Sequence, residues 1–138
     1  MNGRLQIRIA AEAAAALVTH ALAAAPDECC GVLLGREGEI LEAVPAGNIA
    51  DEPRSRFLID PKAHIDARRT ARARGLEVVG FYHSHPSSPA TPSARDVAEF
   101  TYPGSLYAIV SLASEPADIG LFRLDEGNFR RMSFVTVG

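Results

Sequence analysis

Cysteine is scarce in this 138-residue chain, and the little that is present excludes two classes of protein. The two cysteines, Cys29 and Cys30, are adjacent, and adjacent residues rarely satisfy the geometry of a disulfide bond. They provide neither the framework of a disulfide-rich secreted protein nor the paired thiolates of a structural zinc site. Either thiol could bind zinc in principle, but we expect Cys30 to be a small buried residue of a strand. The pair therefore predicts a reducing, cytoplasmic setting.

Long apolar runs and an excess of basic residues are missing as well. The most apolar run, Ala10 to Ala25, contains Glu12 and His20 and falls short of the roughly 20 residues that a membrane-spanning helix needs. The N-terminus shows no charged segment followed by an apolar core and a cleavage site, so no signal peptide is expected. The net charge is −3, whereas nucleic-acid binders are usually basic. We therefore expect neither a membrane nor a nucleic acid as a partner.

The chain has the length of one domain, and we expect residues 1–138 to form a single unit. A chain of this size buries about two-thirds of its unfolded surface, and an apolar content of 47% supports an ordinary core. In chain order, the periodicity predicts strand 5–9, helix 10–25, strands 30–35, 40–44 and 56–59, helix 60–74, strand 76–85, helix 94–100, and strands 106–112, 119–124 and 129–137. This order predicts a three-layer α/β domain with a mixed sheet.

Local signals define the helix ends and two polar surfaces. Asp60 and Pro61 are typical of a helix start, and Gly75 is typical of a helix end. Along this helix runs one basic stripe, which is either a solvated face or a docking surface for an acidic partner: His64, Arg68 and Arg72. The polar loop Gly47–Ser55 is long enough to contact a substrate. In the alanine-rich helix, we expect His20 to be solvated or to cap the helix rather than bind a ligand.

One stretch carries most of the chemistry: residues 80–96, which read G-F-Y-H-S-H-P-S-S-P-A-T-P-S-A-R-D. Because alternate side chains of a strand share a face, His83 and His85 should point the same way and Ser84 the opposite way. Two imidazoles placed like this can both reach a metal at about 2.0–2.1 Å from each nitrogen. Taken alone, such a pair is more often a polar strand end than a metal site.

Ser93 and Asp96 follow a short link that is stiffened by prolines and can turn the chain back over the strand end. The spacing predicts a helix start with Ser93 as the N-cap and Asp96 in the first turn. This structural role is compatible with a second one, because Asp96 is available as a third metal ligand.

The combined pattern resembles the signature of the JAMM (MPN+) zinc metalloproteases. The matching residues are H-S-H-P, the link Pro86 to Pro92, Ser93-x-x-Asp96, and the upstream segment P-D-E-C-C-G at residues 26–31. The resemblance implies the deaminase-like α-β-α sandwich of that family and one Zn²⁺ per chain. It implies His83, His85 and Asp96 as zinc ligands, Glu28 as general acid/base, and Ser93 as the group that helps to polarise the scissile carbonyl. Without the distal motif, Glu28 would be interpreted as a solvated turn carboxylate.

The resemblance also implies an activity. Two histidines and one aspartate leave an open coordination position, the pattern of a catalytic zinc, and the reaction would be amide hydrolysis without a covalent intermediate. Family members cleave peptide or isopeptide bonds after the Gly-Gly tail of ubiquitin-like proteins. The segments E-C-C-G-V-L-L-G and F-Y-H-S-H-P look like those of prokaryotic members, some of which release cysteine from sulfur-carrier proteins. We favour that substrate over lysine conjugates, and formation of a homodimer stays open.

Rival interpretations differ in the residues they require. Zinc nucleoside deaminases need P-C-x-x-C and helical metalloproteases need H-E-x-x-H, and both are absent from the sequence. The alternative from a different class is a non-catalytic MPN-type scaffold or binding module for a ubiquitin-like partner. Such scaffolds usually lose metal ligands or the glutamate, whereas this chain has all of them.

Overall fold

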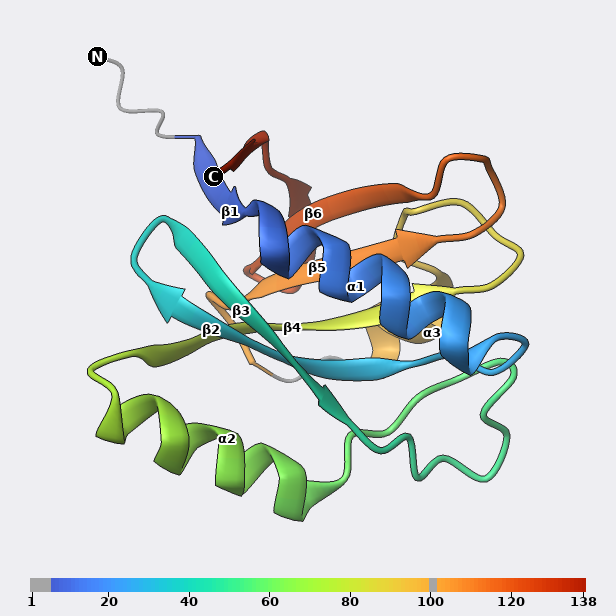
Figure 1. Ribbon diagram of the computed structural model, residues 1–138. Helices are drawn as coiled ribbons and strands as arrows, with labels where there is room; N and C mark the ends of the chain where they lie inside the picture. Colours follow the sequence, from blue (N-terminus) through green and yellow to red (C-terminus); the bar gives the residue numbers. More distant parts are fainter. Residues whose placement is uncertain (1–5, 100–101) are drawn as a thin grey trace.

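The computed structural model describes residues 6–99 and 102–138, and its strands form an eight-stranded mixed sheet with helices on both faces (Figure 1). Helix α1 (Ala11–Ala24) covers one face, and α2 (Pro61–Ala73) covers the other. The short helix α3 (Ala94–Glu99) follows the central strand. The strands are β1 (Ile7–Ala10), β2 (Cys30–Arg36), β3 (Glu39–Ala46), β4 (Glu77–His85), β5 (Leu106–Ser111), β6 (Asp118–Asp125), β7 (Asn128–Arg131) and β8 (Phe134–Val137). The predicted three-layer α/β fold with a mixed sheet is confirmed.

Strand β4 lies in the interior of the sheet, whose order is β7-β6-β5-β4-β2-β3-β1-β8. It runs antiparallel to β2 and parallel to β5. Neighbours on both edges and helices on both faces bury every residue from Gly80 to His85. The near-continuous apolar sequence of this strand is typical of such a position. The two histidines are therefore carried to the C-terminal end of a buried, fixed strand.

Helix α1 packs on the sheet through a narrow stripe of buried residues, Ala13, Leu17 and Ala21, spaced four apart. As an apolar residue next to Ala21, Leu22 would also be expected to be buried, but it is 62% exposed. The reason is geometric, because Leu22 lies about 100° around the helix from Ala21. Among the described residues, neither α1 nor any other helix is both long and apolar enough to cross a membrane.

His20 corrects a second expectation for α1. Rather than being solvated or capping the helix, its Nδ1 lies 2.7 Å from the Tyr82 hydroxyl oxygen on β4, and the two rings meet edge to face. Burial lowers the pKa of His20 and raises the pKa of Tyr82, so the pair is neutral at pH 7. Helical periodicity could not indicate this contact, since the partner lies on a distant strand.

Helix α2 begins and ends close to where the sequence predicts. The Asp60 side chain accepts a hydrogen bond from the Lys62 backbone N–H at 3.1 Å, Pro61 occupies the first turn, and Gly75 adopts a positive φ of 71° after the helix. The basic stripe is not uniformly solvated, however. The ring of His64 is half-buried edge-on against Phe81, and Arg68 donates to its Nε2.

Two predicted strands are wrong. Residues 56–59 form a loop in which only Ile59 makes an isolated bridge, to Asn48. The predicted strand 129–137 is two strands, β7 and β8, which lie at opposite edges of the sheet. No glycine or proline marks the break at Met132 and Ser133, so local pattern could not reveal it. The predicted end residues 5 and 100 lie outside the described part of the chain.

Gly80 is required by the close approach of β4 to β5. A Cβ at this position would lie 2.0 Å from the carbonyl oxygen of Leu106, which is backbone and cannot rotate away. We therefore expect Gly80→Ala to lower the free energy of unfolding by at least about 2 kcal/mol, because overpacking forces the backbone to shift. Denaturant unfolding would measure this, with Gly47→Ala as control, where the nearest atom to the added Cβ would be 3.9 Å away. Equal stability of the two variants would contradict the argument.

Candidate metal centre

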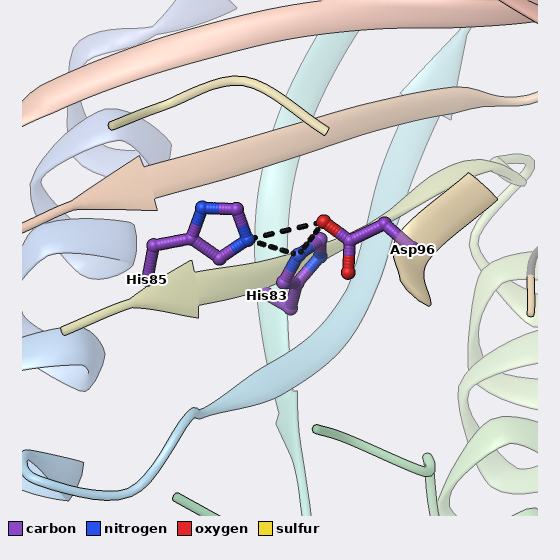
Figure 2. A group of neighbouring side chains, drawn as sticks. All are labelled: His83, His85 and Asp96. Atoms are coloured by element: carbon purple, nitrogen blue, oxygen red, sulfur yellow. Dashed lines mark hydrogen bonds and ion pairs between the residues drawn. The ribbon is translucent and has the colours of Figure 1, made fainter. Parts of the chain in front are cut away.

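His83 and His85 lie on the face of β4 that α2 covers, as their alternation with the buried Phe81 of that face requires. They are 0% and 3% exposed, respectively. Figure 2 shows both imidazoles converging with the carboxylate of Asp96, which arrives from α3. Side chains from the end of β4 and the start of α3 thus meet at one buried point.

Asp96 is held in place by a reciprocal pair of hydrogen bonds at the start of α3. The Ser93 backbone N–H donates to Asp96 Oδ2 at 2.9 Å, and the Asp96 backbone N–H donates to Ser93 Oγ at 3.1 Å. This is the capping arrangement that the sequence predicts, and it stabilises the first turn. The cap also fixes the direction in which the carboxylate points. The same two hydrogen bonds therefore start the helix and position the candidate ligand.

Three atoms of these side chains form a nearly equilateral triangle. His83 Nε2 and His85 Nε2 are 3.1 Å apart, and they lie 3.2 Å and 3.1 Å from Asp96 Oδ2. Ligand atoms held about 2.0–2.1 Å from a tetrahedral zinc ion lie about 3.3–3.4 Å from one another. These atoms therefore fit three corners of such a site, and two imidazoles with a carboxylate are a donor set that suits zinc. Among the described residues, His83, His85 and Asp96 form a group whose potential ligand atoms all lie within 4.8 Å of one another.

The tautomer of His85 is fixed by the proline-rich link. Its Nδ1 lies 2.7 Å from the carbonyl oxygen of Pro89. A carbonyl oxygen can only accept, so Nδ1 carries the proton and the lone pair of Nε2 faces His83 and Asp96. A hydrogen bond of this kind to the second ring nitrogen is the usual support for a metal-bound histidine.

The charge states of two of the three groups, His83 and Asp96, also favour metal binding. Burial lowers the pKa of His83, and the hydrogen bond to Asp96 only partly offsets this. Burial acts to raise the pKa of Asp96, but the hydrogen bonds from His83 and His85 outweigh it and hold that pKa well below its usual range. Asp96 is therefore ionised and His83 neutral at pH 7, as metal ligands must be. Burial also opposes protonation of His85, yet the contacts with Asp96 and the Pro89 carbonyl raise its pKa.

Glu28 lies on the same face as the histidines. Cys30 pairs with His83 across β2 and β4, and Cys29 exchanges two hydrogen bonds with Ser84, at 3.0 Å and 2.8 Å. Continuing this register by one residue places Glu28 beside His85. Glu28 is 8% exposed, and its charge helps to raise the pKa of His85. It is therefore a buried carboxylate next to the triangle rather than a solvated turn residue.

Ser93 is exposed at the rim of the site. Its hydroxyl oxygen accepts from the Asp96 backbone N–H, which leaves the hydroxyl proton available to donate to a bound molecule. The structure thus brings all five predicted site residues to one end of β4.

Two supporting residues were not anticipated. Ser84 is fully buried on the opposite face, and its hydroxyl accepts from the Cys29 backbone N–H, which fixes the segment that carries Glu28. A polar residue in a buried strand always needs a partner, so this signal was present in the sequence. Phe57 stacks on His83 with ring centroids 4.4 Å apart and an interplanar angle of 17°. Its assignment to a strand concealed that contact.

The two cysteines do not join the site. Both are buried, and burial raises the pKa of Cys29 and raises that of Cys30 to about 12. Such groups stay as thiols at pH 7 and are poor metal ligands. Cys30 is the small, buried strand residue that the sequence predicts.

Comparison with known proteins agrees with this geometry. The chain is 37% identical to the desampylase of Haloferax volcanii over 112 residues, which cover 77% of this chain and 81% of that protein. It is 34% identical to the CysO-cysteine peptidase of Mycobacterium tuberculosis over 105 residues, which cover 75% and 71% of the two chains. A solved structure of a protein from Desulfitobacterium hafniense superposes with a TM-score of 0.86 and 28% identity, over 96% of this chain and 93% of that one.

The family described as prokaryotic homologs of the JAB domain matches residues 10–125, which include the β4 histidines, Asp96 and the segment around Glu28. The fold, the site geometry and this match together show that the chain belongs to the prokaryotic JAB family.

Proposed function

We propose that this chain is a zinc-dependent peptidase that hydrolyses the peptide or isopeptide bond after the Gly-Gly C-terminus of a ubiquitin-like or sulfur-carrier protein. The observation that carries the proposal is the triangle of His83, His85 and Asp96 with a buried glutamate on the same face. A non-catalytic scaffold has no need of that arrangement. The names of the relatives, a desampylase and a CysO-cysteine peptidase, support a hydrolase that acts on conjugates of small carrier proteins.

His83, His85 and Asp96 would hold the zinc ion. The metal would supply a Lewis acid and lower the pKa of water at its open position. Glu28 would accept a proton from the attacking water as the water oxygen bonds to the carbonyl carbon. When the C–N bond breaks, Glu28 would deliver that proton to the leaving nitrogen, so the products are a carboxylate and an amine. The Ser93 hydroxyl would donate a hydrogen bond to the carbonyl oxygen as negative charge develops on it.

A cavity of about 700 Å³, which is connected to the candidate metal centre through Phe57 and not lined by the proposed site residues themselves, would offer a place for the carrier protein's tail. Phe57, which stacks on His83, forms part of its wall. The other lining residues are mostly apolar and include Ile49, Leu58, Ile59, Phe81 and Tyr102. A tail that ends in two glycines, which have no side chains, can bring its last carbonyl close to a recessed metal. Apolar residues that precede the glycines would then occupy the cavity.

Asp96→Ala removes the one carboxylate of the proposed ligand set. We expect about one zinc ion per wild-type chain and little in the variant, because two imidazoles alone make a much weaker site. Elemental analysis of protein purified without chelator would measure this. Asp118→Ala, which changes an exposed aspartate at the start of β6, is the matched control. Full retention of zinc by Asp96→Ala would remove Asp96 from the ligand set.

Glu28→Gln keeps the shape of the side chain but removes the proton acceptor. With a carrier protein whose Gly-Gly end is joined to cysteine or to a lysine side chain, we expect the wild type to cleave and the variant to lose at least about 10²-fold in kcat. Zinc content should stay the same. Glu37→Gln, in the exposed turn between β2 and β3, is the control. Near-normal kcat for Glu28→Gln would reject the acid/base role, and a wild type that holds zinc but cleaves neither conjugate would favour the scaffold.

Ser93→Ala should lower kcat by about 10²–10³ with a modest change in KM, because the hydroxyl acts on charge that develops only in the transition state. Loss of the helix cap should cost only about 1 kcal/mol of stability. Steady-state kinetics and thermal unfolding separate these two effects. Ser93→Thr, which keeps a hydroxyl and a cap, should restore most of the rate. An unchanged kcat in Ser93→Ala would reduce Ser93 to a helix cap.

A further inference from the structure

The loop between β3 and α2, residues 47–60, has little regular structure of its own (Figure 1). It forms much of the wall of the cavity. Its base is closed by the isolated bridge between Asn48 and Ile59. The loop also contacts the candidate metal centre at one place and α3 at another. Phe57 stacks on His83, and the Ser55 hydroxyl lies 3.4 Å from an Nη of Arg95, the residue before Asp96.

The side-chain amide of Asn48 organises this loop. Its Oδ1 accepts from the backbone N–H groups of Ala50 and Leu58, both at 3.0 Å. Its Nδ2 donates to the carbonyl oxygens of Arg56, at 3.1 Å, and Glu28, at 2.9 Å. Two N–H donors on one side and two carbonyl acceptors on the other fix the orientation of the amide. Three of these four hydrogen bonds connect residues within the loop, and the fourth connects the loop to Glu28.

The backbone of Glu28 is bonded to the loop at both of its polar groups. Its N–H donates to the carbonyl oxygen of Pro53 at 2.8 Å, and its C=O accepts from Asn48. Glu28 precedes β2, whose pairing with β3 and β4 begins at Cys30. The loop therefore supplies the hydrogen bonds that the sheet supplies elsewhere, and the position of the Glu28 carboxylate depends on it.

We propose that Asn48 is a positioning residue for Glu28, through which the cavity wall and the general acid/base keep one fixed relative position. This inference rests on the proposed role of Glu28. Asn48 itself does not reach the reacting atoms. The Asn48 amide joins two parts of the site into one rigid unit. One part is the cavity wall that would bind substrate, and the other is the Glu28 carboxylate that would move the proton. A displacement of about 1 Å at a reacting group can cost about 10² in rate, so the bond to Glu28 matters for turnover more than for binding.

Asn48→Asp separates the two sides of the amide, because the carboxylate is isosteric and keeps an acceptor for Ala50 and Leu58. It cannot donate to the carbonyl oxygens of Glu28 and Arg56. We expect kcat to fall by about 10–100-fold with KM changed less than about threefold and with zinc content unchanged. The matched control is Asn128→Asp, the same substitution at the exposed first residue of β7. Wild-type kcat in Asn48→Asp would overturn the proposal, as would a loss of activity that only follows a loss of zinc.

Amide hydrogen exchange in the zinc-free proteins tests the attachment of Glu28 to the loop without any use of activity. The Glu28 N–H donates to the Pro53 carbonyl oxygen, so its exchange reports whether Glu28 stays bonded to the loop when the Asn48 bond is lost. In Asn48→Asp, the Glu28 amide should exchange at least about 10-fold faster while the amides of Ala50 and Leu58 keep their protection. Equal acceleration at all three positions, or a variant that does not fold, would show that Asn48 only builds the loop and would overturn the proposal. If the wild-type protein cleaves no conjugate, the proposed function fails, but the exchange result still decides whether Asn48 holds Glu28.

Discussion

A buried carboxylate between two imidazoles is the constraint on which the rest of this structure depends. Placing the charge of Asp96 in the protein interior costs several kcal/mol unless partners offset it. Here the backbone N–H of Ser93 and the nitrogens of His83 and His85 surround one carboxylate oxygen. Such a cluster is most stable when it holds a cation. The buried end of β4, the stiff proline-rich link and the cap of α3 all serve to keep these groups together.

The alternation of side chains along β4 explains how one strand can contribute both to the core and to the candidate metal centre. Phe81, His83 and His85 lie on the sheet face that α2 covers, whereas Tyr82 and Ser84 lie on the face that α1 covers. The second set also supports the site. Ser84 fixes the segment before β2, and the Tyr82 hydroxyl meets His20 on α1. The polar residues of the opposite face thus stabilise the geometry of the metal centre without touching it.

Much of this was predictable from the sequence, because it depends on local signals. Four features follow from residues that are close in sequence: the H-x-H spacing, the Ser93 cap, the Asp60–Pro61 helix start and the buried β4. The predictions that are wrong concern segments whose structure depends on contacts between residues distant in sequence. Residues 56–59 look like a strand but fold as a loop organised by Asn48, and β7 and β8 separate without a local break signal. A single sequence carries no sign that the Asn48 amide reaches Glu28.

His83, His85 and Asp96 are proposed to bind zinc with an open position for catalysis. Zinc X-ray absorption spectroscopy of the protein as purified tests this most directly. The account predicts a shell of nitrogen and oxygen atoms at about 2.0–2.1 Å, with the multiple-scattering signature of two imidazoles and no sulfur. Scattering from sulfur at about 2.3 Å would instead place Cys29 or Cys30 at the metal, and a protein that takes up no zinc would contradict the account altogether.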